Sequence, residues 1–273
     1  NGSSNSAAAP AVTSKRERAH ATRKFFTTDV PLLMYKHRKT MWFAFVMFLF
    51  FVVLGAVSAK YDDTFVRLIL GDGYVNMTLE NIEKGDPMAV YKSGGRMGSF
   101  IGITVNNVNV ALRAFIFGIL AGIPTFYIAM TNGIMVGSFQ YFFYEQGVFA
   151  ESLQGIWLHG AMEIFSIIVA TASGFILAAS VLFPGTYSRF NSFRMGFRES
   201  LYIILSTLPF FVAAGFIEGF VTRLSNTMPL SLNLIIILGS FAFIFFYYMV
   251  YPFILSRKMG KRRELSHYIQ SII

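Results

Sequence analysis

Long, nearly uncharged apolar segments constrain the fold of this chain more than any other feature. Five are clear, at about residues 41–59, 106–131, 156–182, 200–221 and 231–255. Each approaches or exceeds the length of about 20 apolar residues that an α-helix needs to cross a bilayer. In lipid such a segment must satisfy its own backbone hydrogen bonds, so it has to be helical. We therefore predict an all-α protein, a polytopic bundle of transmembrane helices.

Composition excludes several functional classes. The 273 residues include no cysteine, which removes disulfides, thiolate catalysis and cysteine-based metal sites. The formal net charge is +9, but the Lys and Arg residues flank the apolar segments instead of following one surface. We therefore expect no nucleic-acid partner, and we expect the basic tails to bind the anionic lipids of the cytoplasmic leaflet.

The distribution of charge predicts the topology. Eight Lys and Arg residues lie between positions 15 and 39, and five lie between 257 and 263, so both termini should be cytoplasmic. An even number of crossings follows, and a weaker apolar segment at 132–150 brings the prediction to six. The acidic segment 60–104 should be extracytoplasmic, and 183–199, which carries three arginines, should be cytoplasmic. The alternative is that 132–150 is a re-entrant segment or a surface helix.

These assignments divide the chain into three parts. Residues 1–40 should form a cytoplasmic segment that is disordered over residues 1–14 and basic after them, in which 25–39 is either an interfacial helix or a solvated linker. Residues 41–256 should form the membrane domain, with an extracytoplasmic loop at 60–104. Residues 257–273 should form a basic cytoplasmic tail.

Small residues recur four positions apart within the apolar segments. The pairs are Gly118 and Gly122, Gly133 and Gly137, and Gly215 and Gly219. Such pairs let the backbones of neighbouring helices approach closely, so they predict a tightly packed bundle or a homo-oligomer. Pro124 should bend its helix.

Four ionisable residues fall inside the apolar segments. His159 and Glu163 are four apart and share one helix face. With the predicted topology, Glu163 and Arg113 both lie roughly 12 Å from the outer ends of their helices, and His159 and Glu218 lie about 6 Å from theirs. The matched depths predict an ion pair between Arg113 and Glu163, with His159 facing a polar pocket open to the outside.

This cluster has three alternative roles: a structural strut, a site for a ligand, lipid or proton, or a catalytic site. A metalloprotease helix carries His-Glu-x-x-His, which supplies two metal ligands and a base. Here the helix has one His and one Glu, and the other histidines lie in the tails. We therefore expect no catalytic residue, metal or cofactor.

Several sequence motifs resemble those of the stage II sporulation protein M family. They are an Asn-led span (Asn106, Asn107) with paired glycines (Gly118, Gly122), an Asn132-Gly133 dipeptide that should end one helix and start the next, and the helix motif His159-Gly160-x-x-Glu163. Leu158 replaces the proline that often precedes His-Gly in such sequences. The resemblance implies a multi-spanning protein of the bacterial cytoplasmic membrane. The namesake of the family is understood to anchor peptidoglycan-degrading partners.

The resulting functional hypothesis is a non-enzymatic scaffold that recruits protein partners during remodelling of the cell envelope. The alternative is a transporter or lipid-handling protein that uses Arg113, His159, Glu163 and Glu218 as its substrate or proton path. No internal repeat of the kind common in transporters is evident.

Overall fold

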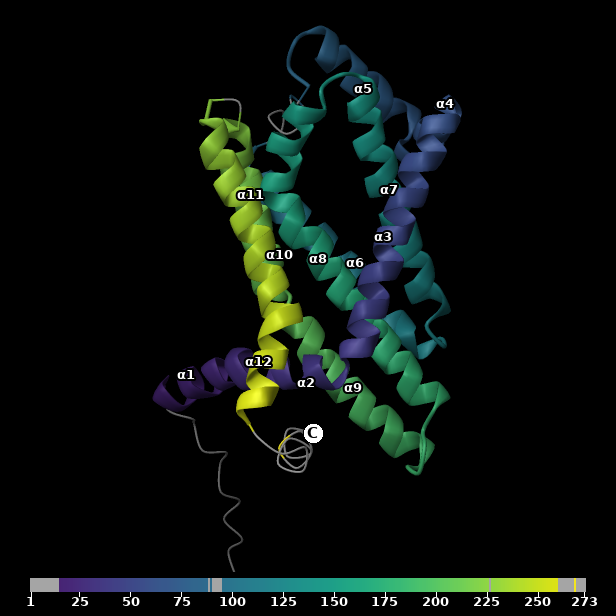
Figure 1. Ribbon diagram of the computed structural model, residues 1–273, viewed down its shortest axis with the longest axis vertical. Helices are drawn as coiled ribbons and strands as arrows, with labels where there is room; N and C mark the ends of the chain where they lie inside the picture. The colour runs from purple at the N-terminus through teal and green to yellow at the C-terminus, as the bar shows by residue number, and fades with distance from the viewer. Residues whose placement is uncertain (1–14, 88, 90–94, 226, 260–267, 269–273) are drawn as a thin grey trace, which may run out of the picture.

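All regular secondary structure in the described part of the chain is helical. The computed structural model describes residues 15–87, 89, 95–225, 227–259 and 268. Within them, five helical segments are long and apolar enough to cross a membrane: Arg38–Tyr61, Arg96–Ile119, Phe149–Leu182, Arg189–Leu224 and Leu230–Lys258. They stand side by side in one bundle (Figure 1). The predicted all-α, polytopic bundle is confirmed.

Helix α8 (Phe149–Leu182) is the central element of the bundle. Its 34 residues extend about 51 Å, and it crosses the bundle diagonally (Figure 1). Leu158, Val169 and Leu177 are fully buried, as are the small residues between them. Because it is covered on most sides by protein, α8 can carry polar residues that a lipid-facing helix could not.

Helix α6 (Arg96–Ile116) continues as the 3₁₀ turn η3 (Phe117–Ile119) and ends at a left-handed turn. Ala121 has φ +56° and Gly122 has φ +75°, and Pro124 lies in the first turn of the next helix, α7 (Ile123–Glu145). Proline fits there because the first helical N–H groups need no partner within the helix. Pro124 therefore starts a helix instead of bending one.

The expected helix boundary at Asn132-Gly133 is wrong. Both residues lie in the interior of α7, where the Asn132 amide donates to the carbonyl of Ile128 at 2.8 Å. The predicted span 106–131 consequently joins parts of two helices. The separate segment 132–150 does not exist as an element either, since residues 132–145 form the second half of α7.

Helix α7 packs in parallel with α3 (Arg38–Tyr61). A Cβ on Gly133 would lie 2.7 Å from Phe51 Cβ, and a Cβ on Gly137 would lie 1.9 Å from the Val52 carbonyl oxygen. The 23 residues of α7 extend about 35 Å, which is the length of a span. Its composition is less apolar than that of the five segments above, so the sixth crossing stays a prediction.

Two short helices follow α3. Asp62 accepts a hydrogen bond from the backbone N–H of Thr64 and caps α4 (Asp63–Leu70), which leads into α5 (Asp72–Glu83). A separate apolar core holds this pair to the ends of α3 and α7, formed by Ala59, Val66, Val75, Phe142 and Phe143. Helix α6 begins at Arg96, within the segment 60–104 that we expect outside the membrane, so the end of this segment is helical.

The N-terminal segment is helical and packs against the bundle. Helices α1 (Lys15–Lys24), η1 (Phe25–Asp29) and α2 (Val30–Lys36) run across the end of the bundle next to α9 (Arg189–Leu205) and α12 (Tyr251–Lys258) (Figure 1). Leu32 and Leu33 are fully buried. Segment 30–36 is therefore part of the protein core. The expected disorder of residues 1–14 and most of the C-terminal tail lie outside the described residues.

The remaining helices complete the bundle. After α9, the chain continues as α10 (Leu208–Phe216), the π-helical turn η4 (Ile217–Val221) and the 3₁₀ turn η5 (Thr222–Leu224). It then returns as α11 (Leu230–Phe245) and η6 (Phe246–Val250), which lead into α12. Segment 189–199, expected as part of a loop, is the first part of α9.

Candidate functional site: a buried His-Glu-Glu cluster

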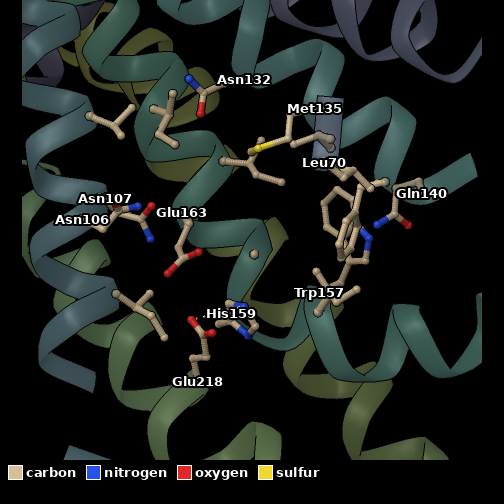
Figure 2. A pocket seen from close by; sticks show the side chains of 18 of the residues that line it. Leu70, Asn106, Asn107, Asn132, Met135, Gln140, Trp157, His159, Glu163 and Glu218 are labelled. Carbon is tan, nitrogen blue, oxygen red and sulfur yellow. Dashed lines mark ion pairs between the residues drawn. The ribbon is translucent and has the colours of Figure 1, made fainter. Parts of the chain in front are cut away.

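Three ionisable side chains from two segments meet inside the bundle. His159 and Glu163 lie one turn apart on α8, and Glu218 comes from η4. One ligand atom from each of the three lies within 4.8 Å of the others. Figure 2 shows the two carboxylates pointing toward each other beside the His159 ring. Glu218 reaches the other two side chains because the π-helical turn η4 packs against α6 and α8.

The cluster forms one wall of a cavity of about 410 Å³. Asn106 and Asn107 of α6 lie beside Glu163, and Gln140 of α7 and Trp157 of α8 lie on the opposite side (Figure 2). Apolar side chains of α3, α4, α6, α7 and α8 also line the cavity. An apolar pocket with a few converging polar groups is the usual form of a small-molecule site.

Hydrogen bonds hold the cluster in place. His159 Nδ1 lies 3.2 Å from Thr222 Oγ1, and His159 Nε2 lies 3.5 Å from Glu218 Oε2. The Asn107 amide donates to the Glu163 carboxylate. His159 is 4% exposed and Glu218 is 7% exposed. Glu163 is half-buried. Two carboxylates inside the bundle, one of them deeply buried, are costly, which marks the cluster as functional or as tightly compensated.

Several buried polar atoms lack a hydrogen-bond partner among the described residues. Glu163 Oε1, Gln140 Oε1 and Trp157 Nε1 are among them, and they belong to residues that line this cavity. Buried polar groups in native proteins are nearly always satisfied by protein, water or a ligand. Their gathering around one cavity indicates that the cavity holds polar contents.

The expected ion pair between Arg113 and Glu163 is wrong. Arg113 is exposed, and the ion pairs recorded for the described residues do not join it to Glu163. Since α6 starts at Arg96, Arg113 falls in its last turn, next in the chain to Ala114, whose carbonyl oxygen would lie 2.2 Å from a Cβ on Gly174 of α8. Gly174 is 11 residues beyond Glu163, or about 16 Å along the helix. Asn107 takes the place beside Glu163 that Arg113 was expected to fill.

The glycines of the expected packing motif differ in what surrounds them. A Cβ on Gly118 would lie 2.2 Å from the Gly174 carbonyl oxygen, so these two glycines allow α6 and α8 to touch backbone to backbone. Gly122 occupies the left-handed turn. A Cβ on Gly160 would meet only Ile156 Cγ2, at 3.8 Å. Gly160 lines the cavity, and its missing side chain leaves space there.

A family model described as stage II sporulation protein M matches residues 44–223. The chain belongs to the stage II sporulation protein M family. The matched range runs from α3 into η5. In this member of the family, the range includes His159, Glu163, Glu218 and Thr222. Comparison with curated proteins finds no match, and neither does comparison with solved structures.

Sequence reasoning missed several residues of the site. Thr222 was not singled out, although it follows Glu218 by four positions, a spacing that often places two residues on one helix face. Gln140 and Trp157, which line the opposite side of the cavity, were not singled out either. A search for polar residues three or four positions from each buried charge would have found Thr222.

Proposed function

We propose that this chain is a non-enzymatic scaffold of the bacterial cytoplasmic membrane that recruits extracytoplasmic proteins during envelope remodelling. The observation that carries the proposal is the folded pair α4–α5, which is fixed to the ends of α3 and α7 by its own apolar core. A rigid platform at the membrane surface can hold a partner in one orientation. Membership of the stage II sporulation protein M family, whose namesake is understood to anchor peptidoglycan-degrading partners, supports the same role.

The outer helix α4 offers a surface for such a partner. Leu68 is 79% exposed although it lies on a helix whose other face is buried in the α4–α5 core. Exposed ion pairs lie in the same pair of helices, between Arg67 and Asp72 and between Glu80 and Lys84. An apolar anchor within a polar rim is typical of protein interfaces. The basic tails would hold this orientation by contact with anionic lipids.

Photo-crosslinking tests the proposal. A photoreactive residue at position 68 in cells should give a discrete adduct with a protein, because a partner would cover this side chain. The matched control is position 238 on α11, where the apolar side chain is also exposed but belongs to a membrane-spanning segment. Adducts with the same proteins at both positions, or no protein adduct at 68, would contradict the scaffold.

The cavity favours a second candidate, a transporter or lipid-handling protein. Its buried, unsatisfied polar atoms form the specific observation in favour. The substitution Glu163→Gln separates the two candidates. A scaffold should retain its crosslink at position 68 in this variant as long as it folds, whereas a transporter should lose movement of its substrate.

A further inference from the structure

The hydrogen bonds around His159 define which ring nitrogen carries the proton. Thr222 Oγ1 donates to the backbone carbonyl of Ile217 at 3.3 Å, so its hydroxyl proton is already used. The contact between Thr222 Oγ1 and His159 Nδ1, at 3.2 Å, is then a hydrogen bond that Nδ1 donates. A neutral imidazole has one N–H only. His159 Nε2 therefore directs a lone pair toward Glu218.

Three electron-pair donors converge as a result. His159 Nε2 lies 3.5 Å from Glu218 Oε2, and a Glu163 carboxylate oxygen completes a group whose atoms are all within 4.8 Å. Such atoms repel one another unless a cation or a proton lies between them. The described residues that line the cavity include no Lys or Arg, so the protein supplies no counter-charge there.

The geometry points to a binding site for a divalent transition-metal ion, of which Zn²⁺ is the simplest probe, formed by His159, Glu163 and Glu218. In a tetrahedron with metal–ligand bonds of about 2.1 Å, neighbouring ligand atoms lie about 3.4 Å apart. The separation of His159 Nε2 and Glu218 Oε2 is 3.5 Å. A set of one imidazole and two carboxylates suits Zn²⁺ and its first-row neighbours better than it suits Ca²⁺ or Mg²⁺.

The surroundings of the cluster match what such a site needs. Protein metal sites orient their ligands through outer hydrogen bonds, and here Thr222 orients His159 while Asn107 orients Glu163. Glu163 Oε1 is buried without a hydrogen-bond partner among the described residues, and it faces the cavity. Three protein ligands leave one position of the metal open.

Metal binding to the purified full chain tests the inference. The protein is stripped with a chelator, re-equilibrated with Zn²⁺, and its metal content is measured by mass spectrometry. We expect one Zn²⁺ per chain. We expect Glu163→Gln and Glu218→Gln each to weaken binding on the order of 100-fold or more, and Thr222→Val to weaken it about 10-fold to 100-fold. The matched control is Glu151→Gln, an exposed position in the first turn of α8, which should bind like the wild type.

Co²⁺ provides a second measurement that needs no variant. Bound by one imidazole and two carboxylates, it should give visible absorption bands that disappear when Zn²⁺ is added. If Glu163→Gln or Glu218→Gln fails to fold, the Co²⁺ spectrum of the wild type and the affinity of Thr222→Val decide. The inference is overturned if wild-type protein binds no stoichiometric metal, or if the Gln variants bind as tightly as Glu151→Gln. Absent metal binding together with Gln variants of raised thermal stability would instead identify a proton shared by the two carboxylates.

Discussion

Lys36 and Glu199 form an ion pair that joins α2 to α9, although 163 positions separate them in the sequence. The second carboxylate oxygen of Glu199 lies 2.5 Å from His37 Nε2. Glu199 is almost completely buried, whereas Lys36 is 36% exposed. The N-terminal helix is thus attached to the bundle by charge as well as by the apolar residues of α2.

Removal of the Glu199 charge should weaken the attachment of α2 to the bundle. Glu199→Gln keeps the shape of the side chain but leaves Lys36 without its carboxylate. We expect a loss of about 1–2 kcal/mol in the free energy of unfolding, below the range for a fully buried pair because water reaches Lys36. Denaturant unfolding in detergent measures it, with Glu145→Gln, an exposed position at the end of α7, as the control. Equal stability of the two variants would contradict the role of the ion pair.

Gly118→Ala should separate α6 from α8. The added Cβ would lie 2.2 Å from the Gly174 carbonyl oxygen, which belongs to backbone and cannot swing away. Overpacking of this kind costs about 1–3 kcal/mol. Thermal unfolding of the purified protein measures the effect. Gly160→Ala serves as the control, because its Cβ would meet nothing closer than 3.8 Å; a larger loss at Gly160 than at Gly118 would refute this account of the contact.

Helix α7 should cross the membrane completely. It runs parallel to α3 and contacts its middle part, so its two ends should lie on opposite sides. The chain contains no cysteine, so a single introduced cysteine is the only thiol of the chain that a maleimide can label. A membrane-impermeant maleimide added to intact cells should label Glu145→Cys but not Leu120→Cys. Labelling of both positions from the same side would mean that α7 is re-entrant and that the protein has five crossings.

The cap of α4 should depend on pH. The Thr64 hydroxyl donates to Asp62 and lowers the pKa of this carboxyl from 3.8. A lowered pKa in the folded state means that the cap contributes stability above the unfolded-state pKa and loses it as pH falls through the folded-state pKa. Below about pH 4, hydrogen exchange in the first turn of α4 should therefore be faster in the wild type than in Asp62→Asn, which keeps a neutral cap. Identical exchange at every pH would exclude the charged cap.

The sequence was sufficient for the class of fold but not for the helix boundaries. Apolar runs identify membrane helices because the bilayer imposes one dominant requirement on all of them. The turn at Ala121 and Gly122 is itself built of apolar and small residues, so hydropathy cannot distinguish it from helix. The predicted span therefore continued through it and placed its end at Asn132.

The site was predictable residue by residue but not as an arrangement. His159 and Glu163 could be paired because four positions on one helix fix their relation. Their relation to Arg113 and Glu218 depends on where other helices begin and how they are rotated. A span that starts near residue 105, as expected from the sequence, places Arg113 level with Glu163. The observed start of α6 at Arg96 moves Arg113 more than two helical turns further along its helix.

The placement of η1 has a consequence for the order of assembly. The hydroxyl of Tyr247 donates to the backbone carbonyl of Phe26, a partner made 221 residues earlier. At about 5–20 residues per second, ribosomes need roughly 10–45 s to make the chain between them. During that time the N-terminal segment lacks its contacts with η6 and α12, whereas its partner Glu199 on α9 is made about 50 residues before Tyr247. The packing of this segment is therefore completed only after the last membrane-spanning helix of the bundle, α11, has been made.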